Sequence, residues 1–110
     1  MPKLSGKAES YRATLLESLQ NPEDAAQYLN ACLDDEDARV FLMALHDVAD
    51  AHGGIRAVSR NTQLNRESLY RMLSKSGNPS LKTLAAVLQT WSLRLAVQSA
   101  LPKARKRRIA

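Results

Sequence analysis

Cysteine and large aromatic residues are scarce in this sequence of 110 residues, which contains one cysteine, one tryptophan and one phenylalanine. The single Cys32 excludes an intramolecular disulfide and a metal site built from cysteines. No apolar run reaches the roughly 18 residues that a membrane-spanning helix needs, and residues 1–7 lack the apolar stretch of a signal peptide. These absences predict a cytoplasmic protein in a reducing compartment.

Acidic residues are almost absent from the second half of the chain. After Gly54 there is one acid, Glu67, against twelve lysines and arginines, which gives a net charge of +11. The first 54 residues carry ten acids and four basic residues, a net charge of −6. This division predicts two surfaces for two kinds of partner. A polyanion suits the basic half, whereas a basic partner, or solvent alone, suits the acidic half.

Motifs for catalysis and for cofactors are missing as well. There is no glycine-rich phosphate loop and no Ser–His–Asp arrangement with a supporting motif. His46 and His52 are six residues apart, not the three or four that bring two ligands onto one helix face. The acids at 34–37 lack the spacing and central glycine of a calcium loop, so we expect them to cap helices. We expect a protein that is not an enzyme and binds no metal or other cofactor.

Helical periodicity extends over most of the chain, because apolar residues recur every three or four positions. Asn21, Asn65 and Ser80 stand where helix N-caps are expected, and Gly53 and Gly54 stand where a helix ends. The predicted helices cover about residues 11–19, 22–33, 37–52, 55–62, 66–74 and 80–91.

The apolar stripes of these helices predict a core. Tyr11, Leu33 and Leu81 belong to stripes that we expect to face inward. Cys32 is expected to be a small core residue, and Trp91 to be a core residue rather than an anchor for a partner.

The two short helices on either side of residues 63–65 have the spacing of a helix-turn-helix. Ser59 stands where a small residue lets the second helix approach. Gln63 occupies a turn position where glycine is common, so it must adopt a left-handed backbone or a slightly different turn. The residues at the offsets that the crossing of the two helices requires are Val58, Ser59, Thr62, Leu64, Leu69 and Met72.

In such a motif the second helix lies in a DNA major groove, with its N-terminal residues towards the base edges. Arg66 can pair bidentately with guanine, and Glu67 can accept a hydrogen bond from cytosine. The outward side chains predicted to contact DNA are Asn65, which is also the expected cap, Arg66, Glu67, Tyr70, Arg71 and Ser74. The basic residues expected to meet phosphates, and so to fix register without reading sequence, are Arg56, Arg60, Lys75 and Lys82.

Part of the sequence resembles a known family. The run Asn65-Arg66-Glu67-Ser68-Leu69-Tyr70 and the loop Gly77-Asn78-Pro79 carry the resemblance most specifically, and residues 21–33 and 41–54 fit the same pattern. They resemble the addiction-module antidote proteins, which are HigA-like antitoxins of type II toxin–antitoxin pairs with a Cro/CI-type helix-turn-helix. The resemblance covers roughly residues 11 to 95.

The resemblance implies a small antitoxin that binds and neutralises a basic RelE/ParE-superfamily toxin. It also implies a homodimer that represses the shared operon by binding double-stranded operator DNA. The sequence departs from the family at Gln63, where the family has glycine, and at Ser59, where it usually has alanine. Together, the residues and the resemblance predict an all-α, lambda-repressor-like helix-turn-helix domain over residues 36–101. An N-terminal helical extension over residues 1–35 precedes it, and a basic tail over residues 102–110 follows.

Several alternatives stay open at this point. The chain can instead be a stand-alone repressor without a toxin partner, or an interaction module in which the helix-turn-helix is only a scaffold. The basic tail can contact DNA, add nonspecific attraction or simply be a charged terminus. The alternation of Leu93, Leu95 and Val97 hints at a short edge strand, which can pair with a second copy, pair with a toxin, or cover the core.

Overall fold

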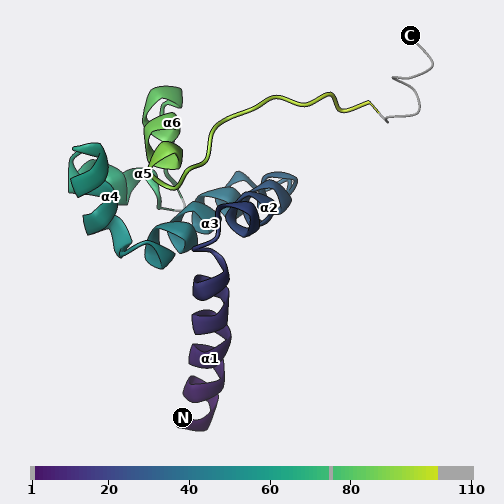
Figure 1. The fold of residues 1–110 in the computed structure, drawn as a ribbon, viewed down its shortest axis with the longest axis vertical. Coiled ribbons are helices and arrows are strands. Elements are labelled where there is room, and N and C mark those ends of the chain that lie inside the picture. The colour runs from purple at the N-terminus through teal and green to yellow at the C-terminus, as the bar shows by residue number, and fades with distance from the viewer. Residues whose placement is uncertain (1, 75, 102–110) are drawn as a thin grey trace.

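The computed structural model describes residues 2–74 and 76–101, and within this part of the chain it contains six helices and no strand. The all-helical class predicted from the sequence is therefore confirmed. The helices are α1 (Pro2–Ser18), α2 (Pro22–Leu33), α3 (Ala38–Ala51), α4 (Gly54–Thr62), α5 (Arg66–Met72) and α6 (Leu81–Thr90). Figure 1 shows α1 projecting away from the other five helices.

Side chains cap the helices where the sequence predicted caps. Asn21 Oδ1 accepts hydrogen bonds from the backbone N–H of Glu23 at 2.8 Å and of Asp24 at 3.4 Å, and so begins α2. Asp37 begins α3 in the same way, accepting from the N–H of Arg39 at 3.0 Å. These bonds satisfy donors that the first turn of a helix leaves without a partner, and each is worth about 1 kcal/mol.

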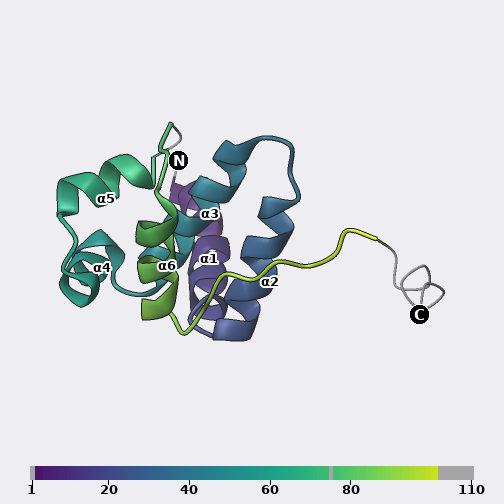
Figure 2. The ribbon, with the colours of Figure 1, turned by 90° about the horizontal axis from the view of Figure 1, so that it is seen from above.

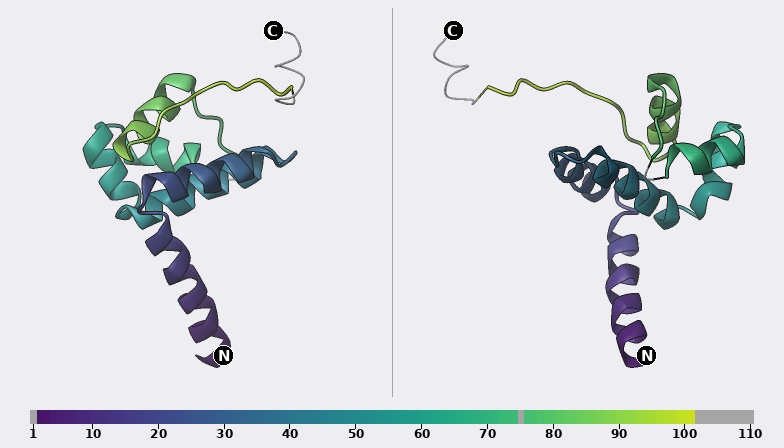
Figure 3. Two further views of the ribbon diagram at one scale, coloured as in Figure 1. Left: turned by 45° about the vertical axis from the view of Figure 1, so that its right-hand side comes forward. Right: turned by 180° about the vertical axis from the view of Figure 1, so that it is seen from behind.

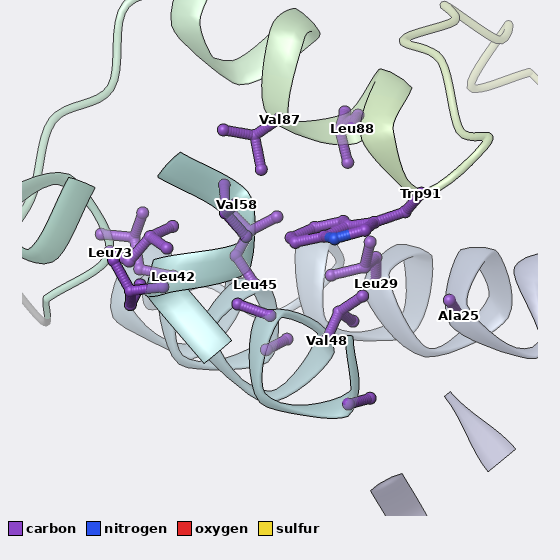
Figure 4. Packing of buried hydrophobic residues seen from close by; sticks show 14 of the residues in the cluster. Ala25, Leu29, Leu42, Leu45, Val48, Val58, Leu73, Val87, Leu88 and Trp91 are labelled. Carbon is purple, nitrogen blue, oxygen red and sulfur yellow. The ribbon is translucent and has the colours of Figure 1, made fainter. Parts of the chain in front are cut away.

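The helix α3 is the centre of the fold, because α1, α2 and α4 all pack against it. Its residues Leu45 and Val48 are completely buried. Figure 4 shows the ring of Trp91 between Leu88 of α6 and Leu29 of α2, and Trp91 is only 3% exposed. The core position predicted for Trp91 is thus confirmed. Burial of each Leu or Val stabilises the fold by about 1.5–3 kcal/mol.

Three residues of the predicted apolar stripes are not in the core. Tyr11 is 76% exposed, Leu33 59% and Leu81 73%. Leu33 and Leu81 are the last residue of α2 and the first of α6, where no neighbouring helix covers the stripe. Tyr11 lies on α1, which leaves the body of the molecule, as Figure 3 shows. Cys32 is half-buried against the core, in agreement with its predicted role.

The helix α1 is longer than predicted, and two kinds of contact hold it to the body. Leu19, in the turn after α1, is 1% exposed and belongs to the core. Above it on α1, the Arg12 guanidinium bridges two carboxylates of α3, with Nη1 3.1 Å from Asp47 Oδ1 and Nη2 2.7 Å from Asp50 Oδ2. One arginine therefore links α1 to successive turns of α3.

The chain after Trp91 leaves the helical body as an extended segment, which crosses α2 in the view of Figure 2. The alternating pattern of Leu93, Leu95 and Val97 had indicated a short strand, but the described part of the chain contains none. The reason is that a strand requires a neighbouring strand, and none lies beside this segment within one copy. None of the described helices combines the length and the apolar character needed to cross a membrane.

Candidate nucleic-acid interface

The pair α4 and α5 is joined by three residues, 63–65, as the sequence predicted. Gln63 has φ 62° and ψ 20°, a left-handed backbone that ends α4, and its N–H donates to the Ser59 carbonyl oxygen at 2.7 Å. Asn65 begins α5, because its Oδ1 accepts from the N–H groups of Glu67 and Ser68 at 2.8 and 3.2 Å. Of the two backbone options predicted for Gln63, the left-handed one is confirmed.

Two hydroxyl groups hold this turn in place. Ser59 Oγ donates to the Leu64 carbonyl oxygen at 2.6 Å. Thr62 Oγ1 donates to the Val58 carbonyl oxygen at 2.7 Å and accepts from the Leu64 N–H at 3.2 Å. The small residue predicted at position 59 thus also fixes the start of α5 relative to α4.

The helix α5 has one buried and one exposed face. Leu69 and Met72 are 1% and 8% exposed and anchor α5 in the core. The exposed residues, which include most of the side chains predicted to contact DNA, are Arg66, Glu67, Ser68, Tyr70 and Arg71. Within the described part of the chain, neither arginine of α5 takes part in an ion pair. The outer face of α5 therefore presents two guanidinium groups, one carboxylate, one phenol and one hydroxyl group to solvent.

Two predicted contact residues have hydrogen bonds within the chain. The Asn65 side-chain oxygen is occupied by the α5 cap described above. Ser74 is only half-exposed, and its Oγ donates to the Arg71 carbonyl oxygen at 2.7 Å. Both side chains thus stabilise the ends of α5. This structural role explains their presence without any contact with DNA bases.

Three of the four residues predicted to meet phosphates are exposed on α4 and α6. Arg56 and Arg60 are exposed on α4, and Lys82 is exposed in the first turn of α6. The helix α4 packs against both α5 and α6, so Arg56 and Arg60 lie on a helix in contact with α5, and Lys82 lies on a helix that packs on the same α4. Lys75 lies outside the described residues.

Sequence reasoning missed Ser68, which lines a shallow depression of about 360 Å³ with Arg71, Gly77 and Asn78. The helical spacing of three between Ser68 and Arg71 was a signal that could have found it. Gly77 shapes the same depression, because a Cβ at this position would collide with the Met72 carbonyl oxygen. The glycine lets the loop after α5 pass close to the end of that helix.

The acidic half of the chain is arranged around α2 and α3. Burial raises the pKa of Tyr28, and its hydroxyl group donates to Asp47 Oδ2 at 2.7 Å, which raises it further. The hydrogen bond from the Arg39 side chain lowers the pKa of Asp37 to about 2.

Within the described residues no group of three or more potential ligands is placed to hold a metal ion.

The sequence profile of the family described as "Probable addiction module antidote protein" matches residues 9–99. The chain belongs to this family. An uncharacterized protein of Haemophilus influenzae is 34% identical to it over 82 residues, which cover 74% of this chain and 84% of the relative. No solved structure matches the chain. The antidote family match includes every helix that carries a predicted contact residue, and it ends before the basic tail.

Proposed function

We propose that this antidote protein is the antitoxin of a type II toxin–antitoxin system and that it represses its own operon by sequence-specific DNA binding. The DNA-binding part of this proposal rests on the outer face of α5. Arg66, Tyr70 and Arg71 are exposed there, opposite the buried Leu69 and Met72, in the half of the chain that has a net charge of +11. In this proposal α4, the turn and α5 are a helix-turn-helix of the lambda-repressor-like class.

Arg66 and Glu67, in the first turn of α5, read base edges in the major groove. Arg71 follows one turn later on the same helix. Arg56, Arg60, Lys75 and Lys82 neutralise phosphates and fix the register of α5 on the duplex. A homodimer would place two copies of α5 in successive major grooves of a palindromic operator.

The toxin part of the proposal is supported by family membership and by charge. An antidote of an addiction module requires a toxin to act on, and we propose a basic toxin of the RelE/ParE superfamily in the cytoplasm. The net charge of −6 on the first 54 residues suits a basic protein, because complementary charge accelerates association and selects partners. The antitoxin acts by direct binding and has no catalytic step.

The DNA part is tested by binding of the full chain to the DNA upstream of its own reading frame, measured by fluorescence anisotropy against a scrambled duplex. Arg66→Ala with Arg71→Ala should abolish the preference for the upstream DNA, because each bidentate arginine contact supplies about 1–3 kcal/mol of discrimination. Arg39→Ala removes an exposed arginine outside the motif and should leave the preference unchanged. A double variant that still selects the upstream DNA would show that α5 is not the reading helix.

The toxin part is tested with the reading frame adjacent to that of this chain. Expressed alone it should arrest growth, and coexpression with this chain should restore growth and give a complex that copurifies. If the neighbour is harmless and no complex forms, the chain is a stand-alone repressor. If the chain also lacks salt-dependent affinity for duplex DNA, it is an interaction module instead.

A further inference from the structure

The extended segment 93–101 has an unused hydrogen-bonding edge. The N–H of Leu93 donates to the Leu88 carbonyl oxygen at 2.9 Å, but within the described residues the backbone groups of residues 94–100 form no backbone hydrogen bond. Such a row of donors and acceptors is a template for a second strand. The segment also exposes apolar side chains, since Val97 is 99% exposed, Leu101 47% and Leu95 42%.

We propose that segment 93–101 pairs with the same segment of a second copy as an antiparallel two-stranded ribbon, with Val97 opposite Val97. The proposed function requires a homodimer, and this ribbon would be the interface of that dimer. The ribbon rests on the proposed function only for the reason why the chain dimerises, which is to bind operator DNA. In this register all nine residues pair, and Leu93 of each copy faces Leu101 of the other.

The pattern of side chains favours this register. Residues directly opposite one another lie on the same face of an antiparallel pair, so Leu93, Leu95, Val97 and Leu101 of both copies share one face, in which Ser99, opposite Leu95, is the polar member. Arg94 then lies opposite Ala100, and no charge faces a like charge. A ribbon centred on Arg94 would instead bring two guanidinium groups together, which is destabilising.

The register also determines where the rest of the chain goes. Leu101 of one copy lies beside Leu93 of the other, and Leu93 lines a cleft of about 510 Å³ that runs between α2 and the extended segment and also includes Asp34 and residues 98–100. In the ribbon this cleft therefore lies beside Leu101 of the second copy, after which the basic tail follows in the sequence, as well as beside residues 98–100 of its own chain. This tail carries five basic residues, namely Lys103, Arg105, Lys106, Arg107 and Arg108.

The edge of that cleft is suited to receive positive charge. Asp34, Asp35 and Glu36 are exposed, and within the described part of the chain none of them is in an ion pair. They follow the C-terminal end of α2, where the helix dipole is negative, and α2 has no basic residue in its last turn. The proposal therefore includes an exchange of tails, in which the basic tail of each copy and the acidic loop 34–36 of the other attract each other, and the occupant of this edge is a second copy of the chain.

The first test measures the dimer of the full chain by sedimentation, without DNA or toxin, so that its failure is distinct from a failure of DNA binding. Val97→Asp places two carboxylates opposite each other and should raise the dimer dissociation constant roughly tenfold or more. Because the Val97 side chain is 99% exposed in one copy, the change removes no packing within the chain. Gln98→Asp faces Ala96 and should change the constant little. A Val97→Asp variant that dimerises as tightly as the original chain would overturn the proposal.

Cross-linking tests the register. In a Cys32→Ser background, Val97→Cys should form a disulfide between two copies, because directly opposite residues are about 4.5–5.5 Å apart at Cα. Arg94→Cys is a matched control, since in this register the two introduced cysteines lie about 20 Å apart along the ribbon. Cross-linking of Arg94→Cys but not of Val97→Cys would exclude the proposed register.

The exchange of tails is tested separately. Asp34→Asn, Asp35→Asn and Glu36→Gln together keep the polar groups but remove the charges, and should weaken the dimer at low salt as much as truncation after Leu101 does. If neither change affects the dimer and truncation weakens only DNA binding, the tail contacts DNA and this assignment is wrong. If Val97→Asp leaves the dimer intact but abolishes toxin capture, the edge belongs to the toxin, which overturns the choice of a second copy.

Discussion

At the scale of single residues, Gln63 holds a backbone conformation that residues with a side chain rarely adopt. Its left-handed φ of 62° costs an L-residue about 1–2 kcal/mol, a cost that glycine does not have. Glycine in turn loses more backbone entropy on folding, which offsets about half of this gain. Gln63→Gly should therefore raise the free energy of unfolding by about 0.5–1 kcal/mol, measured by urea denaturation.

The matched control for this prediction is Gln27→Gly. Gln27 is exposed in the middle of α2, where the backbone is right-handed, so glycine should lower the free energy of unfolding by about 0.5–1 kcal/mol. The same exchange thus has opposite signs at the two positions. Destabilisation by Gln63→Gly would mean that the glutamine side chain has a contact that outweighs the backbone strain.

At the scale of helices, the sequence predicted the features that depend on local chemistry. Asn21 and Asn65 begin helices because a cap involves residues only two or three positions away in the chain. The burial of an apolar stripe depends instead on which distant element covers it. Tyr11 and Leu33 follow the helical period correctly, yet both are exposed because no other helix lies over them.

The same distinction applies to the extended segment and to α5. The alternation of Leu93, Leu95 and Val97 was visible in the sequence, but a strand exists only with a second strand beside it, and one copy supplies none. The outward face of α5 was predictable because Leu69 and Met72 anchor the opposite face. The hydrogen bond from Ser74 Oγ to the Arg71 carbonyl oxygen was not predictable, because it depends on the tight backbone at the end of that helix.

A prediction at this scale concerns Thr62, whose hydroxyl group connects α4 to the turn. Thr62→Val keeps the shape of the side chain but leaves the half-buried Leu64 N–H without its acceptor at 3.2 Å. The loss should lower the free energy of unfolding by about 1–3 kcal/mol, measured by thermal or urea denaturation. Thr14→Val makes the same exchange at an exposed hydroxyl of α1, which donates only to Ser10 within its own helix, and should change stability by less than about 0.5 kcal/mol. Equal effects at both positions would mean that the turn does not depend on Thr62.

At the scale of the whole molecule, the α4–α5 pair and the acidic loop 34–36 lie at different ends of the body. Figures 1 and 2 show α4 and α5 at one end of the body, and the loop between α2 and α3 together with the extended segment towards the other. The basic surface around α5 is thus separated from the acidic loop 34–36. Under the proposed function, this separation allows DNA to be bound while the acidic half is engaged with protein.

The salt dependence of DNA binding tests this arrangement as a whole. Arg56, Arg60, Lys75 and Lys82 in each of two copies would neutralise eight phosphates, so the logarithm of the binding constant should fall against the logarithm of salt concentration with a slope of about −7. Lys82→Ala removes one contact from each copy and should reduce the size of the slope by about 2. Arg39→Ala removes an exposed positive charge in the first turn of α3, next to loop 34–36, and should leave the slope unchanged. If both variants reduced the slope equally, net charge alone, rather than the surface around α5, would attract the DNA.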